Sequence, residues 1–230
     1  MKVNCMIAAV VVFAVFFFAV NDVRAHMHNM MKYASVMSPD MKFQLQWAYN
    51  NETRMLYFKM KCKNTGWCGV GFADGTVNQD GANMMSYDVA IGGSTNSDGY
   101  LWDFWSTSKI RPRLDTLQNV TLMSASEMNG YTMVEFKRLA NSSDPMDVAI
   151  TSDTQVWIMY GSSNLEVTDP TMFSKHLDRQ VLPMKYNLIA MAMAAAAATD
   201  PPAGSAAKCG GSYAAASVIL ALTARFVLSS

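Results

Sequence analysis

The strongest constraint on the fold is a regular alternation of large apolar side chains with small or polar ones in two neighbouring segments. The apolar side chains occupy every second position, namely Phe43, Leu45, Trp47 and Tyr49 in the first segment and Leu56, Phe58, Met60 and Cys62 in the second. A period of two residues places these side chains on one face of a β-strand and the intervening ones on the other. The alternation therefore predicts two half-buried strands.

Several other short segments between turn residues also have the composition of strands. They cover residues 67–72, 87–92, 100–106, 119–126, 131–137, 155–161 and 181–188. Asn129-Gly130 is a strong signal for a two-residue hairpin turn. About nine short strands and no amphipathic helix of convincing length predict an all-β fold, an antiparallel immunoglobulin-like β-sandwich over residues 41–189.

Residues 1–25 have the features of a secretory signal peptide. Lys2 precedes an uncharged apolar run at residues 6–20, and small residues that a signal peptidase reads lie at Val23 and Ala25. The run is shorter than the roughly 20 residues that favour a membrane span, so we expect cleavage after Ala25 rather than retention as an anchor. Residues 26–40 would then form an N-terminal lead that is rich in methionine and histidine.

The C-terminal residues have the features of a membrane attachment signal. Small residues around Gly204 and Ser205 precede a polar spacer and an apolar tail at residues 214–230, which is the order found in signals for a glycosylphosphatidylinositol (GPI) anchor. We expect attachment at Gly204 or Ser205, because Arg225 in the tail disfavours the alternative of a transmembrane anchor. Residues 190–213 are predicted to form an alanine- and proline-rich stalk that contains the anchor site. Together, the two terminal signals predict that the protein passes through the secretory pathway and resides at the extracellular face of the plasma membrane. It would be held there by a GPI anchor or by its apolar tail, and secretion is an expected alternative.

The cysteines and glycosylation sequons agree with export. Cys62 and Cys68 bracket the turn sequence Lys63-Asn64-Thr65-Gly66, and we expect them to form a disulfide at the base of a hairpin in an oxidising compartment. A zinc site is disfavoured because no further cysteine or histidine clusters near the pair. N-glycosylation is predicted at Asn51, Asn119 and Asn141.

Composition and motifs argue against several functional classes. The chain has 18 basic and 18 acidic residues and no basic patch, so nucleic acid is not an expected partner. It has no nucleophile elbow, phosphate loop, dinucleotide-binding motif or His-x-x-x-His pair. We therefore assign no catalytic residue and favour a redox carrier or binding module over an enzyme. Asp144 and Asp147, in a loop with a proline, are interpreted as turn caps.

Several short motifs between residue 43 and about residue 185 occur in the order and spacing of a known family. They are Gly66-Trp67 with Gly69-Val70-Gly71-Phe72, Met84-Met85-Ser86-Tyr87-Asp88-Val89-Ala90-Ile91-Gly92, Asp103-Phe104-Trp105, Leu114-Asp115, Val134-Glu135-Phe136-Lys137-Arg138, Asp144-Pro145-Met146-Asp147 and Val156-Trp157-Ile158-Met159-Tyr160-Gly161. In these motifs the chain resembles the DOMON domain. This β-sandwich module occurs in dopamine β-monooxygenase and its relatives, in the cytochrome domain of cellobiose dehydrogenase, and beside cytochrome b561 membrane domains.

In haem-binding DOMON domains, a methionine and a histidine hold b-type haem from opposite sides without covalent attachment. The resemblance assigns these axial ligands to Met84 and to His176, which is followed by Arg179. Such a pair implies a six-coordinate iron suited to electron transfer. Met85 is the alternative methionine ligand. In the absence of haem, both methionines would be flexible core residues.

Two functions are therefore expected. The first is an extracellular, membrane-tethered haem module that exchanges single electrons with a separate partner protein. The alternative is a non-catalytic recognition or adhesion domain that binds a sugar, a lipid or a protein without haem. A further site, for copper(II), is predicted at the mature N-terminus, where His26 and His28 would stand beside a free amine.

Overall fold

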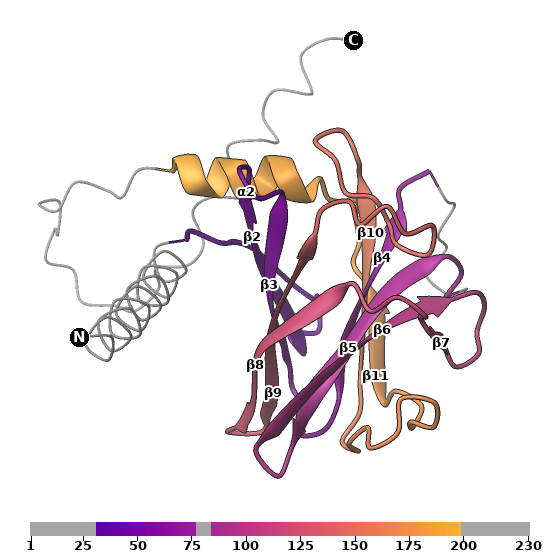
Figure 1. Cartoon of the computed structure of the whole chain (residues 1–230). Helices are drawn as coiled ribbons and strands as arrows, with labels where there is room; N and C mark the ends of the chain where they lie inside the picture. Colours follow the sequence, from indigo (N-terminus) through magenta and orange to yellow (C-terminus); the bar gives the residue numbers. More distant parts are fainter. Residues whose placement is uncertain (1–30, 77–83, 199–230) are drawn as a thin grey trace, which may run out of the picture. The chain divides into compact units, whose positions relative to one another are not determined.

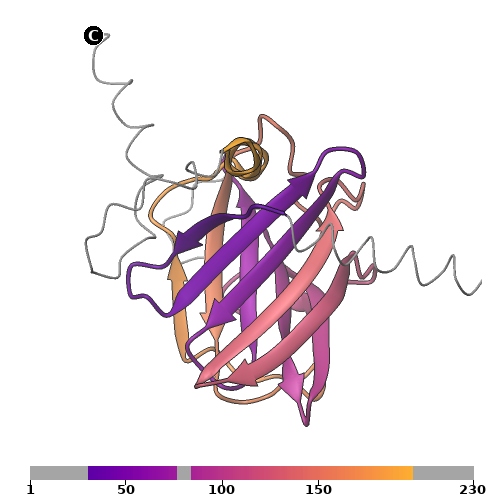
Figure 2. The same cartoon turned by 90° about the vertical axis from the view of Figure 1, so that its left-hand side faces the viewer.

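Two antiparallel β-sheets face one another in the computed structural model, which describes residues 31–76 and 84–198 (Figure 1). The five-stranded sheet has the order β1-β2-β3-β9-β8, formed by β1 (Ala34–Met37), β2 (Phe43–Asn50), β3 (Met55–Cys62), β9 (Tyr131–Leu139) and β8 (Val120–Met128). The six-stranded sheet has the order β11-β10-β4-β5-β6-β7, formed by β11 (Asp178–Val181), β10 (Val156–Ser162), β4 (Cys68–Asp74), β5 (Tyr87–Thr95), β6 (Asp98–Ser106) and β7 (Arg113–Leu114). Figure 2 shows the face of the five-stranded sheet. The predicted β-sandwich is confirmed.

The predicted alternation reappears as alternating burial along β2 and β3. The inward-facing residues of β3 are at most 1% exposed, and the residues between them are half-buried. Phe58 of β3 stacks on Phe136 of β9, with ring centroids 5.0 Å apart, and contacts Phe72 of β4 at 5.3 Å. The side chains selected by the period of two therefore form the core between the two sheets.

Cys62 and Cys68 are bonded to each other, as predicted, but the predicted hairpin is wrong. Cys62 ends β3 in one sheet and Cys68 begins β4 in the other, so the disulfide links the two sheets. Gly66 lies in the connecting segment with φ of 135°, and a Cβ there would stand 2.6 Å from the carbonyl oxygen of Ser163. The close approach to this neighbour and the positive φ therefore require glycine in the segment that crosses between the sheets.

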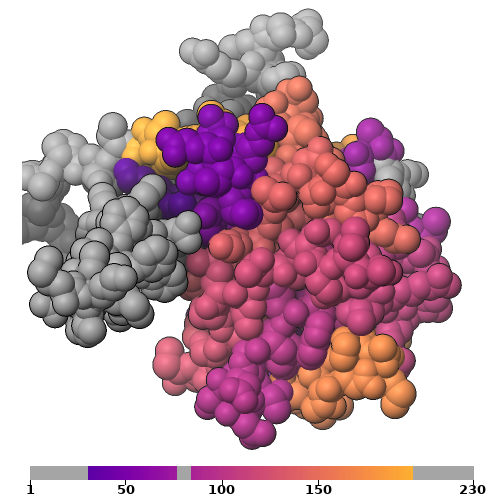
Figure 3. All heavy atoms as spheres, in the orientation of Figure 1, coloured from indigo at the N-terminus to yellow at the C-terminus, as the bar shows by residue number. Residues whose placement is uncertain are grey.

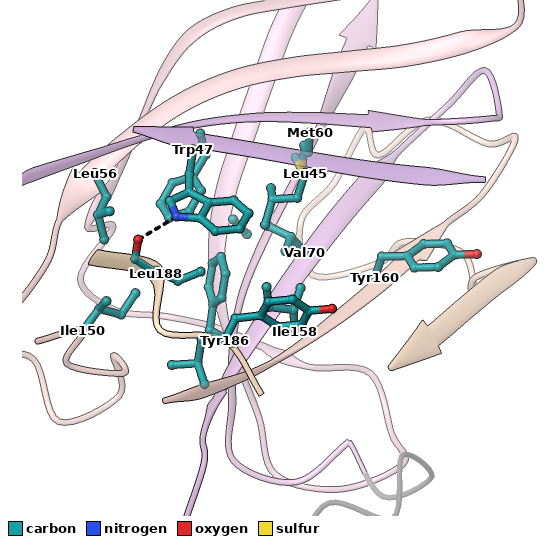
Figure 4. Close-up of a cluster of buried hydrophobic side chains, with 14 of the residues drawn as sticks. Leu45, Trp47, Leu56, Met60, Val70, Ile150, Ile158, Tyr160, Tyr186 and Leu188 are labelled. Carbon is teal, nitrogen blue, oxygen red and sulfur yellow. Dashed lines mark hydrogen bonds between the residues drawn. The ribbon is translucent and has the colours of Figure 1, made fainter. Parts of the chain in front are cut away.

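The predicted stalk does not begin at residue 190, because α2 (Leu188–Ala197) occupies its start. The side chain of Asn187 caps the helix by accepting a hydrogen bond from the amide of Ala190 at 2.9 Å. Leu188 and Ile189 are buried against the sandwich, and the indole nitrogen of Trp47 donates to the carbonyl oxygen of Leu188 at 2.8 Å (Figure 4). The strand predicted over 181–188 is likewise wrong, since β11 ends at Val181.

The predicted N-terminal lead also contains structure, because β1 pairs with β2 along its whole length. The turn predicted at Asn129-Gly130 is confirmed: both residues have positive φ, 55° and 77°, between β8 and β9. The segment between β9 and β10 runs over the surface beside the turn that joins β2 to β3 (Figure 3), where the amide of Ala140 donates to the carbonyl oxygen of Arg54. Among the described residues, no helix has the length and apolar composition needed to cross a membrane.

Candidate functional site

A cavity of about 410 Å³ lies on the outer face of the six-stranded sheet. Val70 and Phe72 of β4 point into the core between the sheets, so Gly69 and Gly71 face the opposite way, toward the cavity. The segment between β6 and β7 and the segment between β10 and β11 form its walls. Its volume is within the range of about 300–1,000 Å³ that is typical of small-molecule sites.

Three glycines without side chains form the floor of the cavity. Gly69 and Gly161 are direct register partners on β4 and β10, and Gly71 is two residues further along β4. A Cβ at Gly161 would lie 3.4 Å from the ring of Trp67 and 3.5 Å from the Cβ of His176. Larger residues at these positions would fill the space that a flat ligand could occupy.

Met84 and His176 both line this cavity. Met84 precedes β5 with a left-handed backbone conformation, φ 48°, and its carbonyl oxygen accepts a hydrogen bond from the hydroxyl of Ser106 on β6. His176 precedes β11, and the amide of the next residue, Leu177, donates to the carbonyl oxygen of Ser162 at 2.8 Å. Two side chains far apart in the sequence are thus held at one site by backbone hydrogen bonds of Met84 itself and of Leu177, the residue that follows His176.

The surroundings of His176 favour its neutral form. Burial lowers the pKa of its imidazole, and the neighbouring cations Arg179 and Lys175 lower it further. A neutral imidazole can offer a nitrogen lone pair to a metal ion. Met85, the alternative methionine, is 48% exposed and is not part of the cavity lining.

The cavity has a basic rim and an apolar interior. The cationic lining residues are Lys109, Arg111, Lys175 and Arg179, and no aspartate or glutamate of the described part of the chain lines the cavity. Arg111 donates to the carbonyl oxygen of Thr171 at 2.8 Å and lies over the ring of Phe173, whereas Trp67, Val89 and Ile91 supply apolar walls. The arrangement suits a largely apolar molecule that also carries negative groups. No local sequence pattern indicates this rim, because its residues are scattered over the segment between β6 and β7, the segment between β10 and β11, and β11 itself.

The structure places the other predicted sites as follows. Asn51 and Asn141 are exposed, but the side-chain nitrogen of Asn119, to which a glycan would be attached, donates to Asp144 at 3.0 Å. Asp144 caps a turn as predicted, since it accepts from the amide of Met146, whereas the carboxylate of Asp147 faces Arg138. The predicted signal peptide, the copper ligands His26 and His28, and the anchor residues Gly204 and Ser205 lie outside the described residues.

Comparison with known proteins gives matches of three kinds. DBH-like monooxygenase protein 1 of Mus musculus is 26% identical over 160 residues, which are 67% of this chain and 25% of that protein. DBH-like monooxygenase protein 2 of the same species is 26% identical over 148 residues, 64% of this chain and 22% of that protein. The chain thus spans about a quarter of the length of the curated relatives it matches.

Among solved structures, the cytochrome b domain of pyranose dehydrogenase from Coprinopsis cinerea superimposes with a TM-score of 0.52 at 11% identity, covering 71% of this chain and 89% of that one. At this identity the likeness concerns the fold. The model of the DOMON domain family matches residues 39–163, more than half of the chain and nearly all of the two sheets described above. The sequence match and the sandwich architecture agree, and on this basis the chain belongs to the DOMON domain family.

Proposed function

We propose that the cavity binds b-type haem and that the protein carries single electrons. The observation that carries this proposal is the placement of Met84 and His176 on one cavity, where a thioether and a neutral imidazole are available as axial ligands. The likeness of the fold to a cytochrome b domain supports it. Haem with two protein ligands would supply reversible one-electron chemistry at its iron.

The residues around the cavity fit such a group. Gly69, Gly71 and Gly161 leave room for a flat ring against the sheet, and Trp67 and Phe173 would pack against its apolar surface. The basic rim would attract carboxylate groups at the edge of the ring, because cations near an anion form charge-assisted hydrogen bonds with it. With both axial positions filled by the protein, electron transfer is favoured over the binding of a substrate at the iron.

An absorption spectrum tests the proposal. We expect protein produced with ample haem to show a Soret band that shifts on reduction, and Met84→Ala and His176→Ala to lose the low-spin spectrum while remaining folded by circular dichroism. Met85→Ala is the matched control, since this neighbour lies outside the lining, and it should keep the wild-type spectrum. A folded protein that stays colourless with excess haem rejects electron carriage and favours the recognition domain.

We also propose that a separate protein is the redox partner and that a lipid anchor holds the domain at the extracellular face of the plasma membrane. The order of small residues, spacer and apolar tail around Gly204 and Ser205 supports the anchor. Phospholipase C specific for phosphatidylinositol should release the protein from intact cells. A chain in which Gly204 and Ser205 are both replaced by leucine should not reach the cell surface in this releasable form.

A further inference from the structure

His176 lies on the cavity although the alternation of the neighbouring strand would turn it away. In β11, Arg179 is the register partner of Gly161, and both residues line the cavity. Because successive residues of a strand point to opposite faces, a strand extended back from Arg179 would place Leu177 on the cavity and His176 on the other face. Instead, His176 lines the cavity, whereas Leu177 is 63% exposed and is not part of the lining. The position of the imidazole therefore depends on a departure from strand geometry just before β11.

Asp178 is the first residue of β11 and marks the end of this departure. Its register partner is Ser162 of β10, which is 1% exposed. Ser162 follows Gly161, whose position faces the cavity, so Ser162 and Asp178 both point to the opposite side of the sheet. The chain thus changes from His176 on the cavity side to Asp178 on the other side within two residues.

Two side chains from other parts of the fold hold the carboxylate of Asp178. The ammonium group of Lys42, in the connection between β1 and β2, forms an ion pair with its Oδ1. The side-chain nitrogen of Asn64, in the segment between β3 and β4, donates to its Oδ2 at 3.3 Å and to the hydroxyl of Ser162 at 2.7 Å. Both carboxylate oxygens are therefore engaged, and Asn64 joins the two register partners Ser162 and Asp178.

Lys42 and Asn64 are themselves held by hydrogen bonds of their backbone. The carbonyl oxygen of Lys42 accepts from the amide of Lys63 at 2.8 Å, and the carbonyl oxygen of Asn64 accepts from the hydroxyl of Thr132 at 2.9 Å. An exposed ion pair holds a geometry weakly when both partners are long, mobile side chains. Here the partners of Asp178 come from backbone that is already fixed, so the carboxylate has a defined place to bind.

A second contact holds the chain on the other side of His176. The hydroxyl of Ser174 accepts a hydrogen bond from the indole nitrogen of Trp67 at 3.1 Å and lies 3.1 Å from the hydroxyl of Ser163. Trp67 is 3% exposed, so this contact is firmly placed. Ser174 comes two residues before His176 and Asp178 two residues after it. The imidazole therefore lies between two fixed points of the chain.

We propose that Asp178, held by Lys42 and Asn64, is a positioning residue that keeps the imidazole of His176 on the cavity as an axial ligand for haem. The proposal rests on the proposed haem site and adds the group that keeps one of its ligands in place. Asp178, Lys42 and Asn64 do not belong to the cavity lining, so they act through His176 alone. An imidazole that is already in place loses less freedom when it binds iron, which makes binding tighter.

Lys42→Met in the full chain tests the proposal, because this side chain lies outside the cavity lining and its ion pair is with Asp178. We expect haemin to bind about tenfold more weakly and part of the iron to lose the low-spin absorption spectrum. Asp178→Asn should have the same effect, and the double variant should be no worse than either single one, since both changes break the same link. Lys42→Arg, which retains the cation, should keep the wild-type spectrum.

Lys59→Met is the matched control. The Lys59–Glu135 ion pair, 3.1 Å long, joins β3 and β9, and its side chains are 33% and 32% exposed, compared with 41% and 24% for Lys42 and Asp178. Neither Lys59 nor Glu135 lines the cavity. Losing this pair should leave haemin affinity and the spectrum unchanged. An equal loss of haemin affinity in Lys59→Met and Lys42→Met would show a general effect on stability and would overturn the positioning role.

Hydrogen exchange of the haem-free chain gives a measurement that does not depend on haem. Lys42→Met should raise exchange at the amide of Leu177, which donates to the carbonyl oxygen of Ser162, while β4 and β5 keep their protection. If the wild type binds low-spin haem and Lys42→Met has the same affinity and spectrum, the positioning role is overturned and the haem site stands. A folded wild type that binds no haem overturns both.

Discussion

Arg138 of β9 and Asp88 of β5 form an ion pair between the two sheets, with both side chains 2% exposed. The guanidinium also donates to the carbonyl oxygen of Val148 at 3.3 Å. Removing water from two charges is unfavourable, so such a pair persists only when its hydrogen-bonding groups are satisfied. The pair therefore connects three parts of the fold: the five-stranded sheet, the six-stranded sheet and the segment after β9.

We expect Arg138→Met to lower the free energy of unfolding by about 3–5 kcal/mol, because it leaves the carboxylates of Asp88 and Asp147 buried without a cation. Urea denaturation measures the change. Arg113→Met, at an exposed position of β7, is the control and should change the stability by no more than about 0.5 kcal/mol. Adding Asp88→Asn to Arg138→Met should restore part of the loss, and a fully stable Arg138→Met would contradict this account.

The Cys62–Cys68 bond gives a second prediction. Closing so short a loop constrains the unfolded chain and contributes about 2 kcal/mol. The double variant Cys62→Ala, Cys68→Ala should therefore unfold at a lower temperature than the wild type. The wild type denatured with a reductant should show a similar loss of stability. Because both cysteines are fully buried, a different loss in the double variant and in the reduced wild type would show that packing of the sulfur atoms dominates. Equal stability of the double variant and the oxidised wild type would refute the prediction.

The strands could be predicted because their signal is local. In β3 the residues that alternate in the sequence are those that alternate in burial, since one face meets the core and the other meets solvent. The disulfide was predictable from spacing, but its position between sheets was not, because a turn sequence looks the same in a hairpin and in a crossing. The helix α2 was missed because an alanine-rich run resembles a stalk until Leu188 and Ile189 are seen buried.

Part of the candidate site could also be predicted from the sequence, and part of it could not. Met84 and His176 were found through their place in family motifs, and the fold brings both to one cavity. The basic rim and the buried carboxylates around Arg138 depend on contacts between segments that are distant in the sequence, so no local pattern indicates them. Asp144 and Asp147 illustrate the difference: in the sequence they are neighbours in a loop, and only the fold adds Asp103 and Asp115 to them.

Filling the cavity floor should prevent haem binding without unfolding the protein. We expect Gly161→Leu to lose the Soret band, because its side chain would extend between Trp67 and His176. Gly161→Ala is the graded control: its added Cβ makes contacts at ordinary van der Waals distances, so the protein should fold and bind haem more weakly. Titration with haemin and a parallel thermal unfolding curve separate the two effects. Unchanged haem affinity in Gly161→Leu would show that the ligand does not lie on this floor.

The hydrogen bond from Trp47 to Leu188 should determine how firmly α2 is held. Trp47→Phe removes the indole donor from a fully buried position and should lower the free energy of unfolding by about 1–2 kcal/mol. Hydrogen exchange should rise mainly at the amides of α2, while β4 and β5 keep their protection, because α2 contacts β2 and β1 at the edge of the fold. Asn187→Ala, which removes the cap but leaves Trp47 in place, should also raise exchange in the first turn of α2. If Trp47→Phe leaves exchange in α2 unchanged, apolar contacts of Leu188 and Ile189 alone suffice to hold the helix.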